Sequence, residues 1–231
     1  MAGKQAGHTA STVSAPALVS SQAMRDLVIG LDFDNTLIDY DQLFVELALE
    51  AGLTGIRPAM TKRELRDTVR LLPDGDIEWQ KLQAMAYGLM IGRAKVARGA
   101  TEFIAKCRQH GTSLKIISHK TRRAAHDPAQ CDLWQTAMEF MRRHRFFDPE
   151  GLGFQGLDVF FEVTRQDKVR RITSLGCHIF VDDLEETFAE PGFPPGVMKV
   201  LFAARGPFTG RDLVVARSWQ EAGDVIFGSG R

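Results

Sequence analysis

The feature that most constrains the fold is an alternation, from Leu27 onward, between short apolar runs and segments of helical periodicity. Apolar runs bounded by turn or polar residues are typical of buried strands. Strands that alternate with helices predict βαβ units and a sheet covered by helices on both faces. We therefore expect an α/β fold with a doubly wound, mostly parallel, Rossmann-like sheet. The predicted strands cover residues 27–31, 113–117, 159–163, 178–181 and 198–202.

Helical patterns occupy two of the intervals between these runs. Phe103, Ile104 and Cys107 share one face of a predicted helix over residues 101–110, which Gly111 ends. Apolar residues around positions 133–141 also recur at spacings of three and four. In open parallel sheets, ligands bind beyond the carboxyl ends of the strands. The functional residues should therefore stand where the apolar runs finish.

The interval between the first two predicted strands is far longer than the roughly 30 residues of a βαβ unit. Its central part has helical periodicity of its own, Thr61 and Glu64 form a capping-box pattern, and a third stretch covers residues 77–94. We predict a small helical insert that lies over the site as a lid. The insert takes residues 40–96, and the core takes residues 25–39 and 97–231.

The composition is that of an ordinary globular protein. Of 231 residues, 44% are hydrophobic and 25% charged, which excludes a collagen-like, coiled-coil or wholly disordered chain. Lys+Arg and Asp+Glu number 29 each, so the formal net charge is zero and nucleic acid is not expected as the main partner. No apolar run approaches the roughly 18–20 residues that span a bilayer, so no membrane partner is expected.

The cysteines and the first residues bear on the cellular compartment. Cys107, Cys131 and Cys177 form no C-x-x-C pair, and because their number is odd we do not expect a disulfide framework. Reduced thiols fit a cytoplasmic protein. Residues 1–24 are rich in Ala and Ser and lack the continuous apolar segment of a secretory signal, so we predict a disordered tail outside the fold.

Acidic residues directly follow two of the predicted strands. The first run ends in the letters DFDNT at residues 32–36, and a later run is followed by Asp182 and Asp183. Clustered carboxylates repel one another, and Mg²⁺, which is usually held by one or two carboxylates plus substrate phosphate, removes that conflict. A solvated turn would explain the first group alone. Two strands that deliver acids to the same edge of the sheet favour a metal site.

Hydroxyl and basic residues stand between these acidic groups. Ser118 ends the run at 113–117, and Lys168 opens the helix before the Asp182 strand. His119, Lys120 and the following residues 121–123 form a cationic stretch. It either lines the rim of the site and binds a second anionic group of the substrate, or is a solvated loop. Lys120 could also compete with Lys168 for a phosphate-binding role.

These elements resemble the motifs of the haloacid dehalogenase-like (HAD) superfamily, in the correct order over residues 27–228. The family's Asp-x-Asp-x-Thr motif matches Asp32, Asp34 and Thr36. Its Ser or Thr after a strand, its basic residue at a helix start and its final acidic pair match Ser118, Lys168 and Asp182-Asp183. The resemblance implies a Mg²⁺-dependent phosphomonoester hydrolase that works through an aspartyl-phosphate intermediate.

The resemblance also implies a role for each matching residue. Asp32 would be the nucleophile, and Asp34 would protonate the leaving oxygen and then activate water. Ser118 and Lys168 would hold phosphoryl oxygens. Mg²⁺ would bind the Asp32 carboxylate, the Asp34 backbone carbonyl and the acids Asp182 and Asp183, with Asp183 favoured as the direct ligand. Residues expected to bind substrate are Asn35, Thr36, His119 and Lys120.

The resemblance further narrows the chemistry. Family members that act on carbon–halogen bonds lack an acid at the position of Asp34, so Asp34 with Asn35 indicates the phosphatase branch. The insert resembles the family's cap, which accompanies small phosphorylated metabolites as substrates. A phosphomutase or phosphotransferase and a non-catalytic module that binds a phospho-ligand or signals remain alternatives. A homodimer is left open.

Two other patterns have ordinary structural explanations. Residues 151–156 fit G-x-G-x-x-G, but they precede a predicted strand instead of following one, so we expect a loop. Trp79, Met85, Tyr87 and Met90 could line the substrate side of the insert, although such residues more often form a core.

Overall fold

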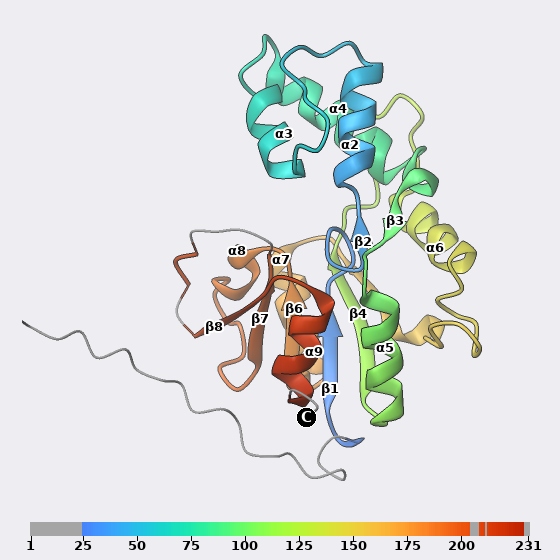
Figure 1. Ribbon diagram of the computed structural model, residues 1–231, viewed down its shortest axis with the longest axis vertical. Helices are drawn as coiled ribbons and strands as arrows, with labels where there is room; N and C mark the ends of the chain where they lie inside the picture. The colour runs from blue at the N-terminus through green and yellow to red at the C-terminus, as the bar shows by residue number, and fades with distance from the viewer. Residues whose placement is uncertain (1–24, 204–207, 211, 229–231) are drawn as a thin grey trace, which may run out of the picture.

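The computed structural model describes residues 25–203, 208–210 and 212–228, so the disordered tail predicted for residues 1–24 lies outside the described residues. Within them, a six-stranded sheet has parallel pairing between all its neighbouring strands. The strands are β1 (Val28–Leu31), β4 (Ser113–His119), β5 (Val159–Glu162), β6 (Ile179–Asp182), β7 (Met198–Phe202) and β8 (Leu213–Ala216). Their order is β5-β4-β1-β6-β7-β8 (Figure 1). The predicted doubly wound α/β fold is confirmed.

Helices cover both faces of this sheet (Figure 1). One face packs under α5 (Ala100–Gln109), α6 (Leu133–Arg143) and α9 (Trp219–Phe227), and the other packs under α7 (Arg165–Ser174) and α8 (Glu185–Phe188). Side chains of β6 alternate between the two cores: Ile179 and Val181 join the first, and Phe180 joins the second. The near-continuous apolar runs of the sequence follow from this burial on both sides.

Gly30 in the central strand has a steric reason. A Cβ atom at this position would lie 2.5 Å from Cδ2 of Phe180, which belongs to the neighbouring strand β6. Ile29 and Leu31 point to the opposite core and are fully buried. The glycine therefore makes room for an aromatic ring at the centre of the sheet.

The predicted elements agree with the structure to within two residues over most of the core. All five predicted strands are present, and the helix predicted over 101–110 is α5. The sequence analysis did not predict strand β8 or helices α8 and α9, whose apolar patterns are short. Residues 151–155 form the expected loop, and a short 3₁₀ helix (Gly156–Asp158) joins it to β5.

Three helices follow β1 in the chain and lie beyond its carboxyl end (Figure 1). They are α2 (Asp41–Glu50), α3 (Lys62–Val69) and α4 (Gly75–Tyr87). The capping box of Thr61 and Glu64 is present at the start of α3, as predicted. The third helical stretch, expected over residues 77–94, is interrupted: α4 ends at Tyr87 with Gly88 as its C-cap, and a 3₁₀ turn (Ile91–Arg93) follows. Gly88 leaves the helical conformation at φ −102° and ψ −109°, and a Cβ there would meet the Ala84 carbonyl oxygen at 2.6 Å.

Two short strands join this helical insert to the core. β2 (Ile38–Asp39) pairs antiparallel with β3 (Lys95–Val96), with Ile38 opposite Val96 and Asp39 opposite Lys95. The chain thus leaves the core and returns to it at one place. Among the described residues, no helix combines the length and the apolar character needed to cross a membrane.

Candidate active site

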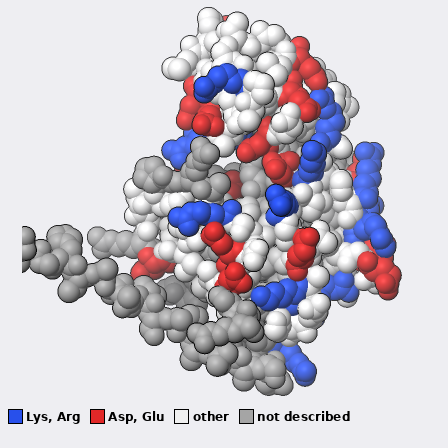
Figure 2. Space-filling view, in the orientation of Figure 1, with Lys and Arg blue, Asp and Glu red and all other residues white. Residues whose placement is uncertain are grey.

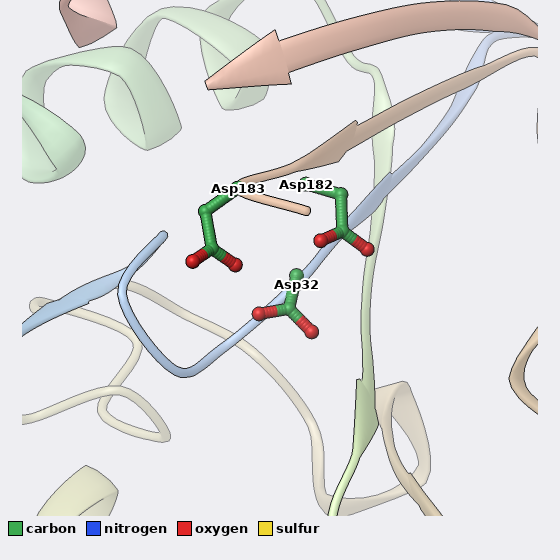
Figure 3. A group of neighbouring side chains, drawn as sticks. All are labelled: Asp32, Asp182 and Asp183. Carbon is green, nitrogen blue, oxygen red and sulfur yellow. The ribbon is translucent and has the colours of Figure 1, made fainter. Parts of the chain in front are cut away.

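The acidic residues meet because β1 and β6 are neighbours in the sheet. Leu31 pairs with Val181, and the backbone N–H of Asp32 donates to the Val181 carbonyl at 2.9 Å. Asp32 and Asp182 therefore emerge side by side at the carboxyl ends of parallel strands. Together with Asp183, each contributes an oxygen to a group whose atoms all lie within 4.8 Å of one another (Figure 3).

Lys168 reaches this acidic group from the first turn of α7. Thr164 caps the helix by accepting a hydrogen bond from the Asp167 N–H, which fixes the start of the helix beside the strand ends. The Lys168 ammonium donates to Oδ1 of Asp32 at 2.5 Å and to Oδ2 of Asp182 at 2.6 Å. Its side chain is only 2% exposed. One buried ammonium therefore bridges the acids of two strands.

The carboxylates remain in excess of the cation that bridges them. Burial raises the pKa of Asp32 to about 7; the neighbouring Asp182 adds to the rise, and Lys168 opposes it. Burial, together with Asp182 and Asp32, also raises the pKa of Asp183 well above its ordinary value. Burial would lower the pKa of Lys168, but its two carboxylate partners outweigh burial and raise it. A cation placed among these acids would relieve the crowding of negative charge.

The donor set fits a hard divalent cation such as Mg²⁺. Lys168 and the Leu184 N–H (2.9 Å) already occupy both oxygens of Asp182. The Asp183 carboxylate makes no hydrogen bond to a described residue, and it faces the cavity described below. Carboxylate oxygens are the ligands that Mg²⁺ prefers. This geometry supports the prediction that Asp183, ahead of Asp182, is a direct ligand.

Asp34 lies apart from this acidic group and has its own partners. Oδ1 accepts a hydrogen bond from the Tyr40 hydroxyl at 2.8 Å, and Oδ2 pairs with the Lys120 ammonium at 2.6 Å. Lys120 is 3% exposed and lies over the rings of Phe33 and Tyr87. The sequence left open whether Lys120 or Lys168 binds phosphate, and the structure gives each lysine a different acidic partner. Lys168 serves the Asp32 group, and Lys120 serves Asp34.

The remaining predicted residues differ in their access to substrate. Ser118, one residue before the end of β4, is almost fully buried. Ser118, Asn35 and His119 all line the cavity. His119 Nε2 lies 3.0 Å from the Val163 carbonyl oxygen, and burial lowers the pKa of the imidazole. Asn35 adopts φ 62°, which supports the expectation that Asn serves at this turn position.

Thr36 is the exception among the expected substrate-binding residues. Its side chain is fully buried, and the residue does not line the cavity. Trp219 of α9 packs beside it and donates its indole N–H to the Thr36 carbonyl at 3.2 Å. The structure therefore places Thr36 beneath the site, where it supports the turn that carries Asp34.

A cavity of about 580 Å³ lies between the strand ends and the helical insert. It contains Asp32, Asp34, Ser118, Lys168 and Asp183 in its wall. The insert contributes Lys62, Gln80, Gln83 and Tyr87, and the core adds Arg123 and Arg165.

Four of these lining residues were not predicted: Lys62, Gln80, Gln83 and Arg165. Gln80, Gln83 and Tyr87 stand at spacings of three and four on α4, which would have indicated one polar face. Lys62 and Arg165 carried no comparable signal. Of the four large insert residues considered from the sequence, Tyr87 lines the cavity, whereas Trp79 stacks on Phe44 in the core.

Charges over the visible face are mixed. Figure 2 shows basic and acidic side chains interspersed on both the helical insert and the core. The acids of the site come from strand ends, away from these outer charges. The local electrostatics of the cavity therefore depend mainly on its own lining residues.

Comparison with known proteins rests on structure, since no protein-family model and no curated protein matches the sequence. A HAD-superfamily hydrolase of subfamily IA, variant 1, from Geobacter sulfurreducens superposes with a TM-score of 0.52 at 12% identity. The match covers 88% of this chain and 97% of that chain. A HAD hydrolase of family IA, variant 3, from Entamoeba histolytica gives 0.51 at 14% identity, over 87% of this chain and 99% of that one. The chain therefore has the fold of the haloacid dehalogenase-like hydrolases.

Proposed function

We propose that the protein is a Mg²⁺-dependent phosphomonoester hydrolase that acts on a small phosphorylated metabolite through an aspartyl-phosphate intermediate. The observation that carries this proposal is the environment of Asp32. This carboxylate is 4% exposed, bridged by Lys168 and grouped with Asp182 and Asp183, yet it still faces a cavity of substrate size. A solvated turn or a purely structural ion pair needs no such opening.

Asp32 is the nucleophile in this scheme. Its carboxylate oxygen attacks phosphorus, the bond from phosphorus to the leaving oxygen breaks, and the phosphoryl group is carried on Asp32. A Mg²⁺ ion bound at Asp32 and Asp183 would neutralise negative charge on the phosphoryl oxygens. Lys168 orients Asp32 and adds positive charge on the same side, and the Ser118 hydroxyl donates a hydrogen bond to a phosphoryl oxygen.

Asp34 moves the proton. In its protonated form it donates this proton to the leaving oxygen, and the resulting carboxylate later takes one from the water that hydrolyses the intermediate, so its protonation state is restored after each cycle. Tyr40 and Lys120 hold both of its oxygens in the present structure. They aim the carboxyl group at the cavity, and one of them must release its oxygen when the leaving group binds.

The test is phosphate release from p-nitrophenyl phosphate and a panel of phosphorylated metabolites, with Mg²⁺ or with EDTA. Asp32→Asn should abolish release, whereas Asp67→Asn, an exposed acid of α3 paired with Arg66, should behave as wild type. Thermal unfolding of both variants verifies that they are folded. Release by Asp32→Asn at the wild-type rate in a metal-replete assay would refute the proposal.

The same assay separates the alternatives. A phosphomutase or phosphotransferase would form a hydroxylamine-labile label on Asp32 from a phosphorylated donor, with no net release of phosphate. A module that only binds a phospho-ligand would show neither release nor label, although the folded protein would still bind Mg²⁺.

A further inference from the structure

The face that the helical insert turns toward the cavity is polar. Its lining residues are Lys62 of α3 and Gln80, Gln83 and Tyr87 of α4. The apolar residues in the cavity wall, Leu133 among them, all come from the core. Gln80 and Gln83 are partly buried residues, and their side-chain amides make no hydrogen bond to a described residue. Such a surface fits a polar leaving group better than an apolar one, because buried donors and acceptors need partners.

Lys62 has no acidic partner of its own. Its ammonium donates to the Tyr87 hydroxyl at 2.6 Å and lies over the rings of Phe44 and Tyr87 at 5.4 and 5.3 Å. No ion pair joins it to a carboxylate of the described residues. Burial works to lower its pKa, but Tyr87 and then Asp183 outweigh burial and raise it, so the ammonium is charged at neutral pH.

Arg123 faces the same cavity from the loop after β4. One of its guanidinium nitrogens donates to the Gln130 carbonyl oxygen, and no described carboxylate pairs with it. By contrast, Lys120 and Lys168 are each paired with acids, and Arg165 lies 3.7 Å from Glu190. Among the described residues of the cavity wall, Lys62 and Arg123 are therefore the cations whose charge is left for a ligand.

We infer that Lys62 and Arg123 supply positive charge that binds a second anionic group, carried on the leaving-group part of the substrate. The substrate class is then a small polar phosphomonoester whose leaving group carries a carboxylate or a second phosphate. Gln80 and Gln83 bind polar groups of the same leaving group. The inference rests on the proposed function for the identity of the scissile phosphoryl group, and it adds the chemistry of the leaving group.

Two matched pairs of compounds test this inference. 3-Phosphoglycerate differs from glycerol 3-phosphate by a carboxylate in place of a hydroxymethyl group, and fructose 1,6-bisphosphate differs from fructose 6-phosphate by a second phosphate. The first pair tests a carboxylate and the second tests a phosphate. For each compound, affinity is measured by calorimetry on the Asp32→Asn protein with Mg²⁺, and kcat and KM are measured on the active protein.

The variants are Lys62→Met, which keeps the side-chain stem over the two rings, and Arg123→Gln. Their matched controls are Lys81→Met, a lysine of α4 paired with Glu78, and Arg122→Gln, a neighbouring arginine paired with Asp132; neither control residue lines the cavity. In at least one pair, we expect the compound with two anionic groups to bind at least tenfold more tightly than the compound with one. Each cavity variant should weaken it about 10- to 100-fold, through KM more than kcat.

The measurements distinguish a failure of this inference from a failure of the proposed function. Equal affinity within both pairs, or an anion preference that survives both cavity variants, overturns the inference even if p-nitrophenyl phosphate is hydrolysed. A preference lost in the cavity variants and kept in the controls supports it, and because calorimetry needs no turnover, this result stands even if phosphate release fails and the proposed function falls.

Discussion

Replacing Lys168 with Met tests how far the buried acidic group depends on one ammonium. Met has a similar length and keeps the packing, but it leaves Asp32 and Asp182 without their hydrogen bonds of 2.5 and 2.6 Å. Removing one partner of a buried ion pair costs about 3–5 kcal/mol. At roughly 2–4 °C per kcal/mol for a chain of this size, the Tm in EDTA should fall by about 10 °C.

The matched control is Lys115→Met, which breaks the Lys115–Asp158 pair at 2.5 Å. Those side chains are 22% and 20% exposed, so the loss should be about 1 kcal/mol or less. Mg²⁺ should stabilise Lys168→Met more than wild type, because the acids then lack their resident cation. Differential scanning calorimetry with and without Mg²⁺ measures both effects. Equal Tm losses for the two variants in EDTA would refute the reasoning.

Three further predictions follow from single contacts. Tyr40→Phe frees Oδ1 of Asp34 and should lower kcat about tenfold, or about 1.4 kcal/mol, in the phosphate-release assay; an unchanged kcat would contradict the positioning role. Thr61→Ala removes the capping box with Glu64 and should cost about 1 kcal/mol in denaturant unfolding, and a neutral result would show that α3 does not need its cap. Asp183 has a folded pKa above its unfolded value, so its carboxyl favours folding at low pH and loses that effect as pH rises through the folded pKa. In EDTA, stability should therefore fall less in Asp183→Asn than in wild type as the pH rises above the ordinary range of a carboxyl group, and parallel curves would argue against this origin.

Several site residues could be predicted from the sequence because they stand directly after predicted strands. Asp32 and Asp182 follow apolar runs directly, and parallel strands end at one edge of a sheet, so their proximity was predictable. Lys168 was found by its place in the order of the motifs. These residues need only the right topology to meet.

Other features depend on contacts between distant segments. That Lys120 pairs with Asp34 follows from the register of β4 beside β1, and no local pattern encodes it. Thr36 was expected at the substrate, but Trp219, 183 positions away, covers it from α9. The end of α4 at Gly88 was also missed, because helical periodicity continues through Met90 although the backbone does not.

The antiparallel pair of β2 and β3 has a consequence for how such a chain can diversify. Because Asp39 lies opposite Lys95, a two-residue turn could join these positions, and the register of the six-stranded sheet would not change. The helices between them form a module that carries Lys62, Gln80 and Gln83. Under the function proposed above, exchange of this module by recombination would alter the choice of leaving group. Tyr40 sets the limit of such an exchange. It stands just inside the module yet holds Asp34, so any replacement must bring its own donor for that carboxylate.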